Sequence, residues 1–419
     1  MYLVLSHAKI IHILKFANCS LQKLLIFSFF AFPLWSHDFS LYLCRMILHI
    51  FNPEHDISLT ATSCPFAPPA AARRLRSDLC FLPALWAGEG DGVLVEDVPA
   101  ALRALDRLGV PKAKVTFLTP EDVRSRGVGE SWRIDPWGWD QVLCHQLVKW
   151  GIPATSLPDK GRLEAIRAVS NRRWAAGHLL PSLCMDPETF TGDALYVTGW
   201  DEGIARKIAS GSWVLKEPWS SSGRGIRYVR QGDPITPHLL GWIRNVIRRQ
   251  GGVMVEPYHE KVLDFGMEFT ASSEGIAYDG LSLFQTVHGA YVGNLLATEE
   301  EKLNLLKSYV NRNVLSSVRQ KIIEILTPLL PNIYQGPFGI DMMVVREQGK
   351  RKVVPCVEMN LRRTMGHVAL AWSRRVPSRG VMRITYEKGQ YGFSIRDTQG
   401  SPDGTGLIDG HGDQVGNDR

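Results

Sequence analysis

The chain has 419 residues, a length that predicts two or three domains rather than a single core. Its 45% hydrophobic and 21% charged residues are typical of a globular protein. The formal net charge of +6 is mild, and no basic run is interleaved with aromatic residues, which argues against nucleic-acid binding. The seven cysteines are odd in number and lack a Cys-x-x-Cys pair, so we expect neither a zinc site nor a disulfide framework.

Residues 1–45 differ in composition from the rest of the chain. An apolar run over 24–35 is too short for a stable membrane span. Lysines precede it as in a signal peptide, but no small-x-small cleavage site follows. We expect an extension upstream of the functional protein, which would begin near Met46; an export signal is the alternative. Free thiols fit a cytoplasmic location.

From Met46 onward, strand and helix patterns alternate. Short apolar runs predict strands at 47–51, 93–95 and 115–118. Helical periodicity predicts helices at 99–108 and 139–150, each followed by a glycine. This βαβ alternation predicts a parallel sheet with helices on its faces.

The middle of the chain mixes strands and helices differently. Ser170 or Asn171 can cap a helix. The patterns then predict strands and one helix, in the order strand 195–197, strand 213–215, strand 226–229, helix 238–249 and strand 253–256. Strands at 264–271, at 276–284 and around Asp341 and Glu358 predict an antiparallel sheet, with a helical stretch over 299–330. The tail at 397–419 is rich in Gly and Asp, and we expect it to be disordered.

A lysine ends one predicted strand, and a loop of serines and glycines follows it. The ammonium of Lys216 can reach phosphate oxygens as a point charge. Serine hydroxyls and glycine backbone amides can surround an anion. The loop residues are Ser220, Ser221, Ser222, Gly223 and Gly225. Taken alone, such a loop is more often an ordinary hairpin connection, and the P-loop motif is absent.

Three oxygen-bearing side chains form the strongest predicted constellation. Glu358 and Asn360 lie two residues apart on a predicted strand, so they share a face. Asp341 on the adjacent strand completes the cluster. Magnesium prefers a few such oxygens, with phosphates and waters filling its octahedron. The alternative is a solvent-facing polar stripe, but the neighbours of these acids are apolar.

The order of these motifs, from about residue 170 to 375, resembles the ATP-grasp superfamily of carboxylate–amine and carboxylate–thiol ligases, which includes D-alanine–D-alanine ligase and glutathione synthetase. The resemblance implies an α/β and α+β protein. A Rossmann-like pre-ATP-grasp domain would occupy 46–165, and a two-lobed ATP-grasp domain 166–396. The lobes would be about 166–255 and 256–396.

The resemblance also implies roles for single residues. Glu256 and Tyr258 match the connector that holds adenine, and Asp264 matches the acid on the ribose, with Glu260 and Glu268 as rivals. Arg172 stands where relatives have a lysine for the α-phosphate. Arg362 shares a face with Asn360 and could bind the reacting phosphate or carboxylate; a surface arginine is an equal alternative.

Two stretches are weaker candidates for substrate binding. The first runs over 286–294, between a predicted strand and a predicted helix, and carries His288, Tyr291 and Asn294. The second follows the first strand and carries Glu54 and His55, where open α/β sheets place ligand groups. Polar loop caps are the alternative interpretation.

The reaction that the resemblance implies is ATP- and Mg²⁺-dependent, with Mn²⁺ as a possible substitute. A small-molecule carboxylate would be activated as an acyl phosphate and joined to an amine, or less readily to a thiol. A homo-oligomer is compatible with this function. Two alternatives stay open: a non-catalytic ATP-binding or regulatory protein, and a small-molecule kinase. The motifs do not identify the substrates.

Overall fold

The computed structural model describes residues 46–109, 114–126, 132–220, 223, 225–287, 290–376 and 379–397. The predicted extension at 1–45 and the predicted tail beyond residue 397 lie outside these ranges, as do Ser221, Ser222 and His288. Within these ranges, no helix is both long enough and apolar enough to cross a membrane.

The first described strands form a parallel sheet. They are β1 (Met46–Ile50), β2 (Gly92–Leu94), β3 (Thr116–Leu118) and β4 (Trp132–Pro136), in the order β3-β2-β1-β4. The helices among them are α3 (His55–Ser58), α4 (Ala70–Leu79), η2 (Leu82–Leu85), α5 (Val98–Leu108), α6 (Pro120–Arg126) and α7 (Gln141–Lys149). Asp97 caps α5, and Gly109 ends it in the left-handed region. The predicted parallel α/β sheet is confirmed, although β4 was not predicted.

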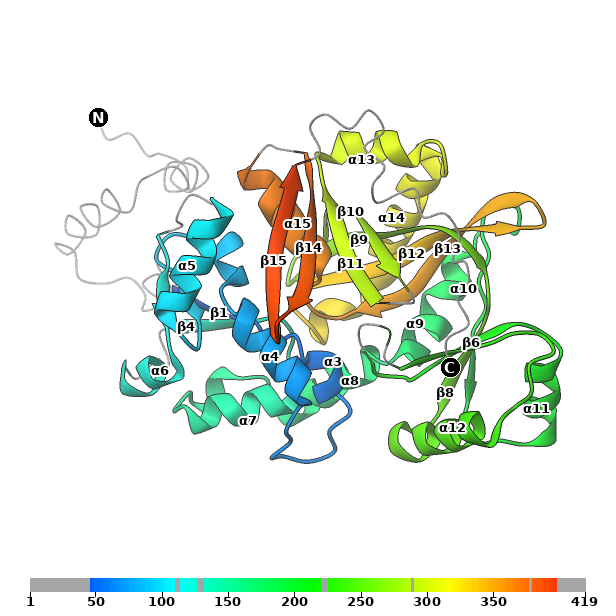
Figure 1. Cartoon of the computed structure of the whole chain (residues 1–419), viewed down its shortest axis with the longest axis horizontal. Coiled ribbons are helices and arrows are strands. Elements are labelled where there is room, and N and C mark those ends of the chain that lie inside the picture. The colour runs from blue at the N-terminus through cyan, green and yellow to red at the C-terminus, as the bar shows by residue number, and fades with distance from the viewer. Residues whose placement is uncertain are drawn as a thin grey trace, which may run out of the picture. The chain divides into compact units, whose positions relative to one another are not determined.

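A second, smaller sheet is antiparallel. It consists of β5 (Leu195–Val197), β6 (Trp213–Lys216), β7 (Ile226–Val229) and β8 (Val253–Pro257), in the order β5-β8-β6-β7. Helices α11 (Glu202–Ala209) and α12 (Pro237–Gln250) lie beside this sheet (Figure 1). Both contribute to its core, in which Leu215 and Ile243 are fully buried. The helices that precede it are η3 (Ala154–Ser156), α8 (Lys160–Val169), α9 (Arg172–His178) and α10 (Leu180–Leu183). Asn171 caps α9, as predicted.

The third sheet has seven antiparallel strands, in the order β13-β12-β9-β10-β11-β14-β15. The strands are β9 (Glu260–Ser272), β10 (Gly275–Val287), β11 (Ala290–Leu296), β12 (Gly336–Glu347), β13 (Lys350–Asn360), β14 (Gly380–Glu387) and β15 (Gln390–Asp397). Its helices are α13 (Glu299–Leu306), α14 (Arg312–Leu326), η4 (Leu330–Asn332) and α15 (Met365–Arg375). A parallel α/β sheet followed by two antiparallel sheets is the predicted fold class.

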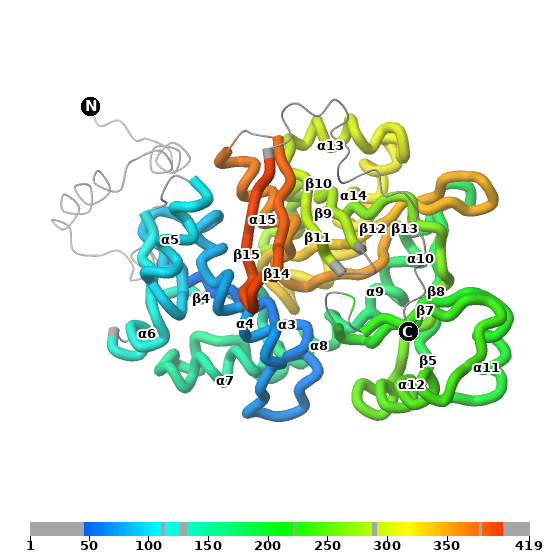
Figure 2. Tube along the Cα trace, in the orientation of Figure 1, coloured from blue at the N-terminus to red at the C-terminus, as the bar shows by residue number. Residues whose placement is uncertain are grey.

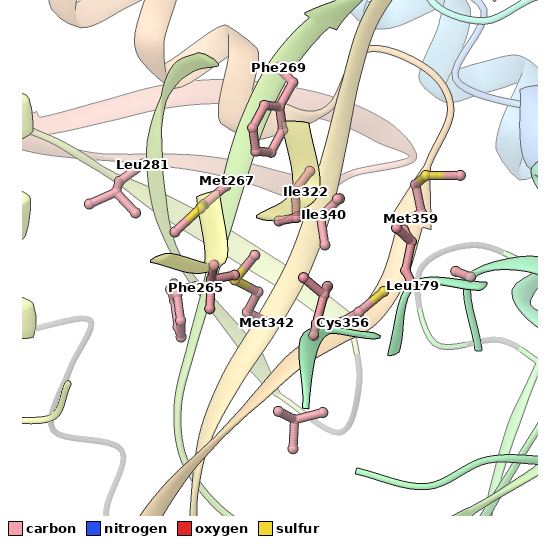
Figure 3. Close-up of a cluster of buried hydrophobic side chains, with 14 of the residues drawn as sticks. Leu179, Phe265, Met267, Phe269, Leu281, Ile322, Ile340, Met342, Cys356 and Met359 are labelled. Atoms are coloured by element: carbon pink, nitrogen blue, oxygen red, sulfur yellow. The ribbon is translucent and has the colours of Figure 1, made fainter. Parts of the chain in front are cut away.

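The central strand β9 separates the core from the polar side chains. Phe265, Met267 and Phe269 are at most 1% exposed and pack in the large core with Ile340 and Met342 of β12 (Figure 3). Because side chains alternate along a strand, residues 264, 266 and 268 face the opposite side of the sheet. That side carries the candidate site.

Two predicted elements differ from the structure. The stretch 286–294 is not a loop between a strand and a helix. Its described residues, 286–287 and 290–294, belong to strands β10 and β11, which pair with each other in the sheet. The helical stretch 299–330 is divided into α13 and α14 because Asn311 caps a new helix. Strands β14 and β15 were not predicted; they extend the sheet beyond β11 (Figure 2).

The parallel sheet and the seven-stranded sheet share a hydrophobic core. Phe51 and Trp137, which follow β1 and β4, pack in one cluster with Val368 of α15 and Met382 of β14. Helix α4 lies against β15. One wall of the site therefore comes from the N-terminal part of the chain.

Candidate functional site

A cavity of about 670 Å³ collects most of the predicted site residues. This volume is in the usual range for a small-molecule site. Its lining comes from the two antiparallel sheets and from segments that follow β1 and β4. It includes the predicted residues Arg172, Lys216, Gly223, Glu256, Tyr258, Asp264, Tyr291, Asn294, Asp341, Glu358, Asn360 and Arg362. Residues far apart in the sequence thus meet in one space.

The three predicted metal ligands lie together. Asp341 of β12 pairs in register with Glu358 of β13. The Asn360 amide donates a hydrogen bond from Nδ2 to Asp341 Oδ2 at 3.0 Å. Burial, and then the neighbouring charge of Glu358, raise the pKa of the Asp341 carboxyl to about 7. A bound cation would stabilise the charged forms of Asp341 and Glu358, which lie side by side and are partly shielded from water.

These donors fit Mg²⁺ better than a softer metal. Among the residues that the structure describes, no group of three or more His, Cys, Asp or Glu side chains could hold a metal ion. Two carboxylates and one amide oxygen are too few for a complete protein cage, but Mg²⁺ usually takes its remaining ligands from phosphates and water. Asp341, Glu358 and Asn360 would hold the ion.

Arg172 ties the serine–glycine loop to the acid cluster. It is the first residue of α9, and its NH2 group donates to Glu358 Oε2 at 2.8 Å. Its guanidinium also donates to Ser220 Oγ at 2.9 Å and to the carbonyl of Glu217 at 2.7 Å. The buried Nε–H has no partner among the described residues. An arginine at this position therefore bridges two parts of the site.

Lys216 ends β6 beside the connector. Its side chain is nearly buried, and Nζ lies 2.5 Å from Glu256 Oε2 on β8. Both side chains line the cavity. A lysine held at the inner end of a strand keeps its charge inside the cavity rather than in bulk water. The structure thus brings Lys216 and Glu256 together.

The described part of the loop is tightly folded. A Cβ atom at Gly225 would lie 2.6 Å from the Ser220 Oγ atom, so any larger residue there would displace Ser220. Gly223 has a φ of 71°, a conformation that favours glycine, and it lines the cavity. A larger side chain would therefore clash with Ser220 at position 225 and would be strained at position 223.

The predicted adenine and ribose residues lie along the same wall. Tyr258 is half-exposed and packs edge-on against Tyr228 at 6.0 Å. Its backbone N–H donates to the carbonyl of Ser212, so this amide is already engaged. Asp264 Oδ2 accepts hydrogen bonds from Lys261 Nζ at 2.9 Å and Thr286 Oγ1 at 2.6 Å. Of its two rivals, Glu260 is exposed beside Arg346, and Glu268 lies deep in the cavity.

Arg362 is anchored by the N-terminal part of the chain. Its Nε–H donates to both carboxylate oxygens of Asp56 at 2.9 Å, and its NH2 group donates to Asn360 Oδ1 at 2.8 Å. Burial alone would raise the pKa of Asp56, but the charge and hydrogen bonds of Arg362 outweigh it and hold that pKa below its usual range. Arg362 is therefore no surface arginine.

The two residues predicted next to Asp56 lie elsewhere. Glu54 is buried and accepts a hydrogen bond from Arg76 NH1 at 2.8 Å. His55 is fully buried, with Nδ1 3.1 Å from Asp140 Oδ2. Neither lines the cavity, whereas Asp56 does. At the short helix α3, Asp56 thus lies toward the site, whereas Glu54 and His55 are buried within the N-terminal part of the chain.

Tyr291 and Asn294 lie at the deeper end of the cavity. The Tyr291 hydroxyl donates to Asn294 Oδ1 at 2.6 Å, and Asn294 Nδ2 donates to Ser282 Oγ at 2.7 Å. Burial raises the pKa of Tyr291, so this phenol stays protonated. This hydrogen-bond chain, although drawn from a region predicted as a loop, is built on two paired strands.

Two site residues were not placed correctly by sequence reasoning. Asp56 stood next to Glu54 and His55, and only the direction of α3 separates it from them. Glu268 was weighed as a ribose ligand, but it lies at the deeper end with Ser282 and Asn294. The two-residue period of β9 was the available signal, because it puts Asp264 and Glu268 on one face, four residues apart.

No protein-family model and no curated protein sequence matches this chain. Its fold is similar to several solved structures. N5-carboxyaminoimidazole synthetase from Staphylococcus aureus, solved with ADP, is 12% identical, with 82% of this chain and 83% of that chain covered and a TM-score of 0.47. A structure assigned to the ATP-grasp superfamily, from Archaeoglobus fulgidus, is 12% identical over 84% of this chain and 99% of that one, with a TM-score of 0.44. The biotin carboxylase domain of 2-oxoglutarate carboxylase from Hydrogenobacter thermophilus, solved with MgADP, is 13% identical over 74% and 72%, with a TM-score of 0.43.

At these identities and TM-scores the similarities carry no argument about this chain. Within the chain itself, a parallel α/β sheet precedes a small and a large antiparallel sheet. The motif residues Lys216, Asp341 and Glu358 line one cavity. The predicted fold class, a parallel α/β sheet followed by antiparallel sheets, is thus confirmed.

Proposed function

We propose that this protein is an ATP- and Mg²⁺-dependent ligase that activates a carboxylate as an acyl phosphate and joins it to an amine. One observation carries the proposal. The acids Asp341 and Glu358 and the cations Lys216, Arg172 and Arg362 line a single cavity of about 670 Å³. The proposed reaction needs acidic groups to bind the metal and positive groups to bind the phosphates and the substrate carboxylate, and this cavity has both.

The ion pairs of the site are consistent with nucleotide binding, because their cations can change partners when phosphates enter. Arg172 is paired with Glu358, and Lys216 with Glu256. When phosphates enter, the two cations can turn to phosphate oxygens. Glu358 is then released to the metal, and Glu256 to the nucleotide. Each buried charge keeps a partner in both states, which avoids the large penalty of an unpaired buried ion.

The chemistry follows from this arrangement. Magnesium, when bound by Asp341, Glu358 and Asn360, supplies positive charge against the phosphate oxygens. The substrate carboxylate attacks the γ-phosphorus, the bond to the β-phosphate oxygen breaks, and ADP leaves. An amine then attacks the acyl carbon, phosphate leaves, and the amine loses a proton. The protein contributes positioning and electrostatic stabilisation rather than a covalent group.

Arg362 is suited to hold the substrate carboxylate. Asp56 and Asn360 occupy its Nε–H and part of its NH2 group. NH1 donates to the carbonyl of Arg363 and keeps a second N–H that a carboxylate can accept. The guanidinium is therefore held in place, and one N–H of NH1 remains for a ligand in the cavity. This role makes Arg362 the residue that brings the carboxylate to the phosphate.

The test traps the activated carboxylate. The protein is incubated with ATP, Mg²⁺, a library of small carboxylates and hydroxylamine, and hydroxamate and ADP are measured. We expect both products with at least one carboxylate, and loss of both in Glu358→Gln but not in Glu260→Gln, a matched change at an exposed glutamate. Phosphoester formation without hydroxamate would identify a kinase instead. ATP binding without ADP release under any condition would identify a non-catalytic binding protein.

A further inference from the structure

The deeper end of the cavity has polar groups that the proposed nucleotide chemistry does not use. We call this region the acceptor end and define it by Glu268, Ser282, Tyr291, Asn294 and Thr364. All five line the cavity. They come from β9, β10, β11 and the start of α15, so the region is built on rigid elements rather than on a loop.

The backbone leaves space for the Glu268 side chain. A Cβ atom at Gly366 would lie 1.8 Å from Glu268 Oε1, and one at Gly339 would lie 2.5 Å from Oε2. Any other residue at either position would push the carboxyl group out of place. Glu268 itself is only 3% exposed. Strand β12 and the start of helix α15 thus each have a glycine where this acid needs room.

One oxygen of Glu268 is engaged and the other is not. Oε2 accepts a hydrogen bond from Thr364 Oγ1 at 2.8 Å and lies 3.1 Å from His367 Nδ1. That histidine nitrogen also accepts the backbone N–H of Thr364, so it carries no proton to share with Oε2. No described residue donates a hydrogen bond to Oε1. Because Glu268 lines the cavity, Oε1 is the carboxyl oxygen that is left for a ligand to donate to.

The cations nearest to Glu268 have other partners. Lys302 is buried, and its Nζ donates to the carbonyl of Leu281. Arg362 is held by Asp56. Burial, followed by the charge of Asp341, raises the pKa of Glu268 to about 8. Neither Lys302 nor Arg362 forms an ion pair with Glu268, so a ligand can supply a positive charge in contact with this carboxyl group.

The remaining surface of the acceptor end is neutral and partly apolar. Ser282 and Asn294 hydrogen-bond to each other, and the Tyr291 hydroxyl completes that chain. Phe284, Met365 and Ile384 also line the cavity. A deprotonated anionic ligand would bring no donor to Oε1, and a thiol would offer only a weak donor. An amine attached to an apolar group matches both features, because its N–H groups can donate to Glu268 and its apolar part can contact the apolar side chains.

We propose that the acceptor end binds the amine substrate, a primary or secondary amine attached to an apolar group, and that Glu268 Oε1 accepts the hydrogen bond of its nitrogen. This inference rests on the proposed ligase function, which it makes more specific. It assigns Glu268 a binding role that excludes carboxylates and phosphates from the second substrate position.

The test measures amine binding without ATP, so that no turnover is needed. Hexylamine and phenethylamine are titrated into the full-length protein by calorimetry, against hexanol and 3-phenylpropionate as matched neutral and anionic probes. We expect the amines to bind at least about tenfold more tightly than the matched probes, since a charge-assisted hydrogen bond exceeds 1.4 kcal/mol. Equal binding of amine and alcohol by the wild-type protein would overturn the proposal without any variant.

The variants locate the effect. Glu268→Gln keeps the size of the side chain and an acceptor for Thr364, and it should weaken amine binding about tenfold or more. Glu260→Gln changes an exposed glutamate of the same strand and should leave amine binding unchanged. Unchanged amine affinity in a folded Glu268→Gln protein would refute the role of Glu268. Hydroxamate formation by the wild-type protein separates the two proposals. If hydroxamate forms but amine affinity does not depend on Glu268, only the acceptor assignment fails. If amine affinity depends on Glu268 but no hydroxamate forms, only the ligase assignment fails.

Discussion

Replacing Asp341 with asparagine should make the ligand-free protein more stable at neutral pH while removing a metal ligand. The folded protein raises the pKa of Asp341 from 3.8 to about 7, mainly through burial and then through Glu358. Between these two pH values the native state holds a proton that the unfolded chain has lost. The free energy of unfolding therefore falls as the pH rises from about 4 to about 7.

The size of this effect follows from the shift. A difference of about three pKa units corresponds to about 4 kcal/mol, because each unit is worth about 1.4 kcal/mol. Asp341 is partly exposed to the cavity, so water reduces this figure, and about 4 kcal/mol is an upper bound. Asp341→Asn does not titrate. Its stability should exceed that of the wild type above pH 7 and match it near pH 4.

Urea denaturation between pH 4 and pH 8, without nucleotide or metal, measures this difference. The charge of Asp341 helps to raise the pKa of Glu268 to about 8, so that shift is smaller in Asp341→Asn, and the change at Glu268 adds to the difference in the same direction. Asp193→Asn, at an exposed aspartate, is the control and should follow the wild-type curve. The reasoning is refuted if Asp341→Asn is less stable than the wild type at pH 7.5, or if the two curves stay parallel across the whole range.

Three further predictions concern other parts of the account. Lys216→Ala should weaken ATP binding by about tenfold or more, because a charged phosphate contact is lost; an unchanged dissociation constant in a calorimetric titration would remove Lys216 from the nucleotide site. Asp56→Ala should lower the free energy of unfolding by roughly 3 kcal/mol, since it leaves Arg362 buried without its partner; adding Arg362→Met should recover most of that loss in urea denaturation, and no recovery would show that Asp56 acts otherwise. A chain that begins at Met46 should fold and bind ATP like the full-length protein, and loss of folded material in circular dichroism would show that residues 1–45 belong to the structure.

The local patterns predicted the elements that have their own periodicity. The strand that ends in Lys216, the pair of strands around Asp341 and Glu358, and the helix capped by Asn171 all follow from residues close in sequence. Strand alternation was sufficient to place Glu358 and Asn360 on one face. The short strand β4 was missed because its five residues, which include an arginine and an aspartate, show too weak an apolar pattern to indicate a strand.

The contacts between distant segments could not be predicted in this way. Nothing near Asp56 in the sequence indicates that it pairs with Arg362, more than 300 residues away. The position of Glu268 depends on Gly339 and Gly366, which are separate in sequence and adjacent only in the fold. The stretch with Tyr291 and Asn294 has a glycine-rich, loop-like composition, and only pairing with β10 and β14 makes it a strand. The predicted domain limit at 165/166 stays a prediction, and it lies within helix α8.

The central claim is that Asp341, Glu358 and Asn360 hold a divalent ion against the phosphates of ATP. Binding of Mn²⁺, followed by electron paramagnetic resonance with and without ATP, tests it without relying on turnover. We predict that ATP strengthens Mn²⁺ binding to the wild type, and that Glu358→Gln weakens the ternary complex by about tenfold or more at an unchanged melting temperature. Equal Mn²⁺ affinity of a well-folded Glu358→Gln protein and the wild type, in the presence of ATP, would contradict the account.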